Sequence, residues 1–141
     1  YGRRPTGEDP QEWAMQAVER GAGELVITSI SQEGTGKGFD IELTAPIAEA
    51  VSIPVIALGG AGKLQDICDV IRLGKTDAVS IASMLHYHFI KQMNNFDEHG
   101  FGSEGNVDFL RRGQQFTIIQ DTSIQETKAY LRDQGINCRD D

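Results

Sequence analysis

Residues 54–63 read Pro-Val-Ile-Ala-Leu-Gly-Gly-Ala-Gly-Lys, a short apolar strand that runs into a glycine-rich turn and then into a helical pattern. Gly59, Gly60 and Gly62 have no Cβ, so they let backbone N–H groups approach an anion closely. The helix that follows begins near Lys63 and points the positive end of its dipole at the same place. The stretch therefore predicts a cradle for a phosphate group.

A second strand repeats this scheme further along the chain. Residues 77–83 read Asp-Ala-Val-Ser-Ile-Ala-Ser, so the strand ends in small side chains at Ala82 and Ser83. In a parallel sheet the carboxyl ends of neighbouring strands meet at one edge, which is where ligands bind. We expect the two strand ends to share one phosphate.

Composition limits the classes of function. The chain has 141 residues, of which 39% are hydrophobic and 24% charged, enough for one domain with a real core. Its formal net charge of −8 argues against nucleic acid or an anionic membrane as the main partner, since phosphate backbones select basic surfaces. No apolar run approaches the ~18 residues of a membrane span, and no segment resembles a signal peptide. A cytoplasmic location is expected.

Helix and strand patterns alternate along the rest of the chain. A helix is expected after Asp9, an N-cap followed by proline, with Trp13 on its buried face. The nearly continuous apolar run at residues 24–29 is typical of a strand covered on both sides. Either Asp40 or Thr44 caps the next helix. The remaining elements are a strand at 54–58, an amphipathic helix from 64 that ends at Gly74, a strand at 77–82 and a helix that starts with a capping box at Ser123.

This order of elements predicts an α/β fold in which parallel strands alternate with helices, because right-handed crossovers produce a parallel sheet. Three strands are too few to stand alone, and each repeat has the length expected of a (β/α)8 TIM barrel of about 250 residues. We therefore expect the C-terminal half of such a barrel, a single half-barrel domain over residues 1–141. Residues 91–122 interrupt the pattern and are expected to form an inserted loop, with a helical turn at 107–112.

Several motifs, in a consistent order and spacing, give the chain a resemblance to a known family. They include residues 21–24 (Gly-Ala-Gly-Glu), 38–40 (Gly-Phe-Asp), 53–63, 82–83 (Ala-Ser) and 130–137 (Tyr-Leu-Arg-Asp-Gln-Gly-Ile-Asn). Over residues 1–90 and 123–139 the sequence resembles the C-terminal half of the cyclase subunit of imidazole glycerol phosphate synthase. The resemblance implies a lyase of histidine biosynthesis that uses ammonia from a glutaminase subunit to convert a phosphorylated ribonucleotide-type substrate. It implies no metal and no cofactor.

The resemblance also implies site residues. Those matching the family's phosphate-binding motifs are Gly59, Gly60, Ala61, Ala82 and Ser83, and those matching its substrate cleft are Thr28, Glu33 and Gly34. Glu33 stands where the family pattern has Asp, and Leu58 stands where it usually has Ser. The extra methylene of Glu33 moves the carboxylate by about one bond, and misplacements of about that size can lower a rate about a hundredfold.

The resemblance implies no catalytic residue within this chain. The resemblance assigns acid and base catalysis to two aspartates on the family's first and fifth strands, and no residue of this chain matches either one. Glu24 matches an acid in the charged ring that closes the ammonia entrance of the barrel. Since acid/base catalysis needs groups within hydrogen-bond reach of the reacting atoms, the segment alone is expected to be inactive.

Residues 91–122 carry a second resemblance. A Glu-Gly-Asn segment at 104–106 and a Thr-Ser-Ile helix start at 122–124 are similar to a paralogous branch of cyclase-like proteins, which pair with a glutaminase to amidate sugars for surface polysaccharides.

His86 and His88 have a spacing that permits metal binding on a strand only. No further cluster of His, Cys or acidic residues completes a ligand set, so no metal site is expected.

A half-barrel predicts association. Its outer strands would expose unpaired N–H and C=O groups, and its inward face would expose apolar side chains. The isolated chain is therefore expected to form a homo-oligomer. A self-assembling, non-catalytic phosphate-binding half-barrel is the alternative to both enzymatic interpretations.

Overall fold

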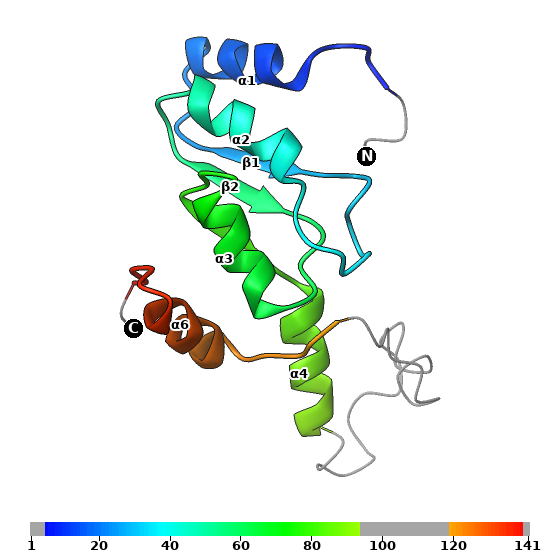
Figure 1. Cartoon of the computed structure of the whole chain (residues 1–141). Helices are drawn as coiled ribbons and strands as arrows, with labels where there is room; N and C mark the ends of the chain where they lie inside the picture. Colours follow the sequence, from blue (N-terminus) through cyan, green and yellow to red (C-terminus); the bar gives the residue numbers. More distant parts are fainter. Residues whose placement is uncertain (1–4, 94–118, 140–141) are drawn as a thin grey trace.

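The computed structural model describes residues 5–93 and 119–139 of the chain. Helices and strands alternate in it as the sequence predicts (Figure 1). The elements are α1 (Pro10–Glu19), β1 (Leu25–Thr28), α2 (Ile41–Ala50), β2 (Val55–Leu58), α3 (Leu64–Arg72), β3 (Ala78–Ser80), α4 (Ser83–Met93) and α6 (Ile124–Asp133).

The three strands form one parallel sheet in the order β1-β2-β3. Leu25 pairs with Val55 at the start of the first ladder, and Leu58 pairs with Ser80 at the end of the second. Each strand follows a helix and is laid down beside the previous one, which is the βα repeat of a (β/α)8 barrel. The predicted α/β class, with parallel strands alternating with helices, is confirmed.

The predicted caps fix where the helices begin. The Asp9 carboxylate accepts hydrogen bonds from two N–H groups of α1, and Ser123 forms a capping box with Glu126 at the start of α6. Asp40, rather than Thr44, caps α2 through the N–H of Leu43. Pro46 lies inside α2, which nevertheless continues to Ala50.

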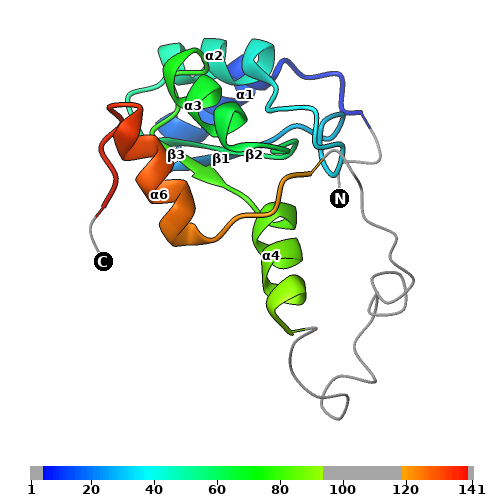
Figure 2. The same cartoon turned by 60° about the horizontal axis from the view of Figure 1, so that its bottom comes forward.

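Helices α1, α2 and α3 lie over one face of the sheet (Figure 2). Two buried clusters join them to it. One contains Val55 of β2 with Ala14 and Ile47 from α1 and α2, and the other contains Ala57 of β2 with Ile67 of α3 and Leu131 of α6. Cys68 of α3 is wholly buried in the second cluster, and this burial raises the pKa of its thiol.

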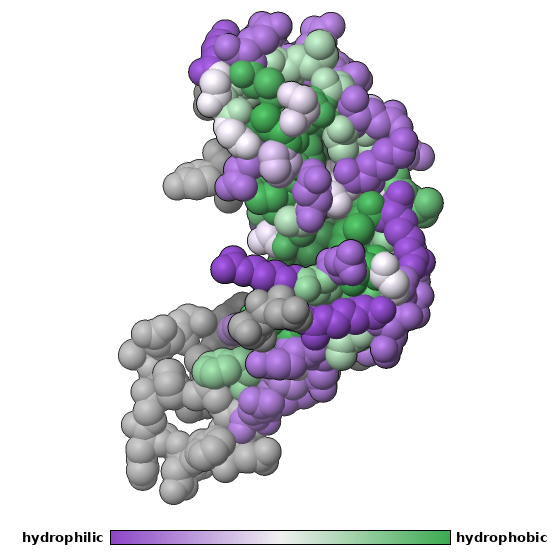
Figure 3. Space-filling model, turned by 90° about the vertical axis from the view of Figure 1, so that its left-hand side faces the viewer, coloured by the Kyte–Doolittle hydropathy of each residue, from purple (hydrophilic) through white to green (hydrophobic). Residues whose placement is uncertain are grey.

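The other face of the sheet is exposed, although the sequence pattern predicted that it would be buried. Residues 24–29 were expected to form a strand buried on both sides, yet Val26 is 54% exposed and Thr28 is also exposed. The prediction is wrong because apolar residues on both faces of a strand show that both faces are apolar, but not that an element within the described residues covers each of them. Figure 3 shows apolar side chains gathered at the level of α1, α2 and β1, between bands of polar ones.

Trp13 is a second correction. It was expected in the core, but it is 52% exposed, and the guanidinium of Arg20 lies 5.9 Å from its ring centroid. Helix α1 packs on α2 beside the edge strand β1, which leaves much of the Trp13 ring exposed. Tyr130 of α6, by contrast, packs against the buried cluster under α3.

The predicted insertion at 91–122 is described only at its two ends. Lys91 and Met93 belong to α4, and residues 119–122 form an extended segment that leads to α6. The helical turn expected at 107–112 lies outside the described residues. Among the described helices, none combines the length and the apolar character that crossing a membrane requires.

Candidate phosphate site

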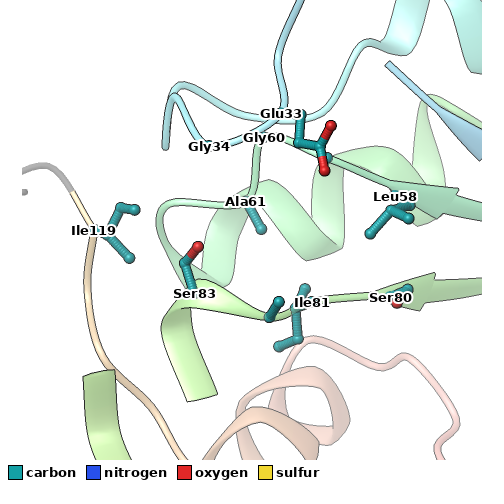
Figure 4. Close-up of a pocket in the computed structure, with 11 residues that line it drawn as sticks. Glu33, Gly34, Leu58, Gly60, Ala61, Ser80, Ile81, Ser83 and Ile119 are labelled. Carbon is teal, nitrogen blue, oxygen red and sulfur yellow. The ribbon is translucent and has the colours of Figure 1, made fainter. Parts of the chain in front are cut away.

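A cavity of about 220 Å³ lies at the carboxyl ends of β2 and β3 (Figure 4). One side is formed by the turn after β2, and the facing side by the end of β3 and the start of α4. The residues lining it are Glu33, Gly34, Leu58, Gly59, Gly60, Ala61, Ser80, Ile81, Ala82, Ser83 and Ile119.

The residues matched to the family's phosphate-binding motifs are all brought together here. Gly59, Gly60 and Ala61 line the cavity from the turn after β2, and Ala82 and Ser83 line it from the end of β3 and the start of α4. Figure 4 shows the hydroxyl of Ser83 pointing toward the Ala61 turn. Two neighbouring strand ends thus contribute to one concave site, which is where open α/β sheets bind ligands.

The glycines of this turn also allow a close contact between two backbone segments, which was not predicted from the sequence. Gly60 has φ +105°, and a Cβ added to it would lie 2.1 Å from the carbonyl oxygen of Gly38. A Cβ on Gly62 would lie 2.0 Å from the carbonyl oxygen of Gly36. The N–H of Gly38 donates to the carbonyl of Gly60 at 2.8 Å. The turn after β2 and the turn after β1 therefore pack backbone against backbone, and this contact requires glycine as strictly as an anion would.

The start of α3 differs from the prediction. The buried carboxylate of Asp66 accepts hydrogen bonds from the N–H groups of Gly62, at 2.9 Å, and Lys63, at 3.0 Å. These donors are therefore used within the protein, and the positive end of the α3 dipole already faces a negative charge. Lys63 itself is exposed and does not line the cavity.

Other donors are left for a ligand. Within residues 5–93 and 119–139, the backbone N–H groups of Ala61 and Ser83 meet no protein acceptor. Ser83 is the first residue of α4, an eleven-residue helix, and the N–H groups that open a helix have no partner within it. The positive end of the α4 dipole therefore lies at this terminus. The helix dipole at the cavity is thus that of α4 rather than that of α3.

The turn after β1 forms a further part of the wall. It brings Glu33 and Gly34 to the cavity, as the resemblance implied. The carbonyl of Ser29 accepts the N–H of Glu33 at 2.9 Å, and the Ser29 hydroxyl donates to Asp40 at 2.9 Å. Asp40 therefore both caps α2 and anchors this turn. Among the described residues that line the cavity, Glu33 has the only ionisable side chain, so this part of the chain offers an anion dipoles and no cation.

Two residues implied by the resemblance lie elsewhere. Thr28, at the end of β1, lines a broader hollow of about 550 Å³ beside α1 and α2 instead of the cavity. Glu24 lies immediately before β1, at the amino end of the sheet, and is exposed. The substrate-cleft residues are therefore divided between two neighbouring hollows.

Three lining residues were not predicted from the sequence. Ser80 and Ile81 belong to the predicted strand, but only the register of β3 shows that they reach the cavity. Ile119 follows a long segment of different composition, and no local pattern relates it to the turn at 59–62. Of the two histidines, His88 lies against Gln92, Asp121 and Glu126. In the described part of the chain, no group of three or more His, Cys, Asp or Glu side chains is arranged to hold a metal ion.

Parallel βα units with a cavity at the carboxyl ends of adjacent strands are typical of the (β/α)-barrel class. A model of the family described as histidine biosynthesis protein matches residues 1–91 of the chain. The chain belongs to this family.

A curated relative extends the comparison beyond that range. The chain is 39% identical over 138 residues to the imidazole glycerol phosphate synthase subunit HisF of Anoxybacillus flavithermus (strain DSM 21510 / WK1). The match covers 98% of this chain and 42% of that relative. The chain therefore spans less than half the length of the subunit it resembles.

Proposed function

We propose that this chain is the phosphate-binding part of a glutaminase-coupled, ammonia-using cyclase of histidine biosynthesis. The observation that carries the proposal is the cavity in which the ends of β2 and β3 bring together Gly59, Gly60, Ala61, Ala82 and Ser83. Membership of the histidine biosynthesis family and similarity to a subunit of imidazole glycerol phosphate synthase support it.

The cavity suits a phosphate monoester. The N–H groups of Ala61 and Ser83 and the Ser83 hydroxyl are donors at its surface, and the α4 dipole favours negative charge there. The proposed ligand is one phosphate of a phosphorylated ribonucleotide-type substrate, with the rest of the substrate extending toward β1 and Thr28. In this proposal Glu24, at the opposite end of β1, lies on the side from which a glutaminase partner would deliver ammonia.

The described residues bring one carboxylate, that of Glu33, to the cavity. Catalysis by an acid and a base needs two such groups near the reacting atoms. We therefore propose that the chain by itself binds phosphate without turnover, and that catalytic groups come from the part of the enzyme that this chain does not span.

Phosphate binding by the intact chain is the direct test. Titration with inorganic phosphate, followed by calorimetry or ³¹P NMR, should show saturable binding. Ser83→Ala should weaken it about tenfold, because a hydrogen bond to a charged group is lost. Ser52→Ala is the matched control, since Ser52 is an exposed serine before the other end of β2. Equal loss in both variants, or no saturable binding by the unmodified chain, would overturn the proposal.

Activity needs a second experiment. The chain should be mixed with, or fused to, the N-terminal part of the Anoxybacillus subunit that it does not match. Ammonia-dependent consumption of the phosphoribosyl substrate by the mixture, and not by either part alone, is the expected result. Turnover by this chain alone would contradict its assignment as the non-catalytic part.

A sugar-amidating cyclase-like subunit is the second candidate, and two lining residues favour it. Glu33 and Leu58 both reach the cavity, and they are the positions at which the chain departs from the histidine-pathway pattern. If these departures change the substrate, the double variant Glu33→Asp, Leu58→Ser should raise turnover of the histidine-pathway substrate in the fused protein. If the double variant does not change this turnover, the proposal of a histidine-pathway cyclase is preferred.

Association of the isolated chain is a third and separate proposal. The uncovered face of the sheet exposes Val26, and β1 is an edge strand. Exposed apolar strands of this kind pair readily with other chains. Light scattering should show a homo-oligomer at micromolar concentration, and a stable monomer would remove the self-assembling half-barrel from consideration.

A further inference from the structure

Residues 119–122, which we call the strap, form an outer wall of the cavity. Ile119 lines the cavity, and Figure 4 shows it on the side away from Leu58. The N–H of Gln120 donates to the carbonyl of Gly62 at 2.7 Å, and the N–H of Thr122 donates to the carbonyl of Met84 at 3.3 Å. The strap therefore bridges the glycine-rich turn after β2 and the first turn of α4, the two elements that supply the proposed phosphate donors (Figure 1).

Side chains fasten the strap at its centre and at its end. The Asp121 carboxylate pairs with the ammonium group of Lys91 on α4, and a second oxygen lies 3.8 Å from Nδ1 of His88. Thr122 is 2% exposed, and its hydroxyl lies 3.4 Å from that of Thr127 on α6. The four residues of the strap thus contact the turn after β2 and helix α4, which are distant in sequence, and the following helix α6.

We propose that the strap completes the phosphate pocket and that Asp121 is its positioning residue, which holds Ile119 against the cavity through Lys91. This inference rests on the proposed phosphate-binding function and adds a wall that the phosphate-binding motifs do not contain. Ile119 excludes water from one side of the cavity, and hydrogen bonds from N–H groups to an anion are stronger where water is excluded. Loss of the Asp121 pair frees the strap at that point and lets water reach the anion.

The charges around Asp121 are compatible with this role. Lys91 and His88 face it from α4, and Glu126 of α6 faces His88 at 3.9 Å. Hydrogen bonding and charge attraction from Lys91 lower the pKa of Asp121, so the carboxylate is ionised at neutral pH. None of these groups lines the cavity, so each acts on the anion only through the strap.

The test compares phosphate affinity with thermal stability in four variants of the intact chain. Asp121→Asn and Lys91→Gln each remove one partner, and each should weaken inorganic phosphate binding about threefold, the scale of a partly exposed ion pair. Asp121→Glu keeps the charge and should restore affinity. Glu49→Gln is the matched control, because it removes the exposed Lys75–Glu49 pair on the opposite side of the described fold from the strap and should leave affinity unchanged.

Each outcome separates the strap from the phosphate site itself. If the unmodified chain fails to bind phosphate, the proposed function is wrong. If it binds and both Asp121→Asn and Lys91→Gln bind equally well, the strap proposal is wrong. Ile119→Ala gives an independent measurement, since it removes the wall without touching the ion pair, and it should weaken binding at least as much. A fall in thermal stability without a change in affinity would assign Asp121 a purely structural role and also overturn the proposal.

Discussion

The two walls of the cavity are built in different ways. The inner wall is a glycine-rich turn whose backbone packs directly on the turn after β1, with Gly60 and Gly62 against Gly38 and Gly36. The outer wall is the strap, which is held by two backbone hydrogen bonds and by side chains on α4 and α6. Backbone packing leaves no room for adjustment, whereas long charged side chains can rearrange. The inner wall should therefore be rigid and intolerant of substitution, and the outer wall adjustable.

The strongest test of this difference is Gly60→Ala. Its Cβ would lie 2.1 Å from the Gly38 carbonyl oxygen, and the backbone has φ +105°. We expect the free energy of unfolding to fall by about 2–4 kcal/mol, measured by urea denaturation.

Gly23→Ala is the matched control for this substitution. No heavy atom lies within 4 Å of a Cβ added at Gly23, so stability should change by less than about 0.5 kcal/mol. If the two variants unfold at the same urea concentration, the inner wall is not the rigid element described above.

This contrast also explains what the sequence could and could not predict. The strands, the caps at Asp9 and Ser123, and the meeting of Ser83 with Gly60 follow from local patterns, because parallel βα repeats place successive strand ends side by side. The role of Gly62 as a packing residue could not be predicted, since glycine is equally suited to an anion and to a close backbone contact. Ile119 was missed because its position depends on hydrogen bonds to residues far away in the sequence.

The exposure of Trp13 has a related cause. Periodicity shows which face of a helix is apolar, but not whether the element that covers this face lies within the same stretch of chain. Val26 illustrates the same point on β1, where an apolar side chain points to the uncovered face. Local pattern therefore predicted the elements well and the burial at the edge of the sheet poorly.

A smaller effect is expected at the start of α3, where Asp66→Ala removes the acceptor of the Gly62 and Lys63 N–H groups. Loss of such a cap should lower the free energy of unfolding by about 1–2 kcal/mol. Asp69→Ala on the same helix is the control, because Asp69 accepts only from the Gln65 side chain among the side-chain hydrogen bonds of the described residues.

The same variant shows which helix faces the anion. If the α4 terminus supplies the dipole, phosphate affinity of Asp66→Ala should stay within about twofold of the original value, once folding is accounted for. A large gain in affinity would mean that the freed N–H groups of α3 reach the ligand, and the assignment of the dipole to α4 would then be wrong.

The smallest expected effect is the pH dependence of the outer wall. Hydrogen bonding from Lys91 lowers the pKa of Asp121 in the folded chain below its ordinary value. The pair therefore contributes stability above the ordinary aspartate range, and this contribution is lost as the pH falls through the folded-state pKa. Urea denaturation between about pH 6 and pH 3 should show about 0.2–1 kcal/mol more loss in the original chain than in Asp121→Asn. Identical pH profiles would mean that the ion pair does not fasten the strap, and the outer wall would then depend on the backbone bonds of Gln120 and Thr122 and on the contact of Thr122 with Thr127.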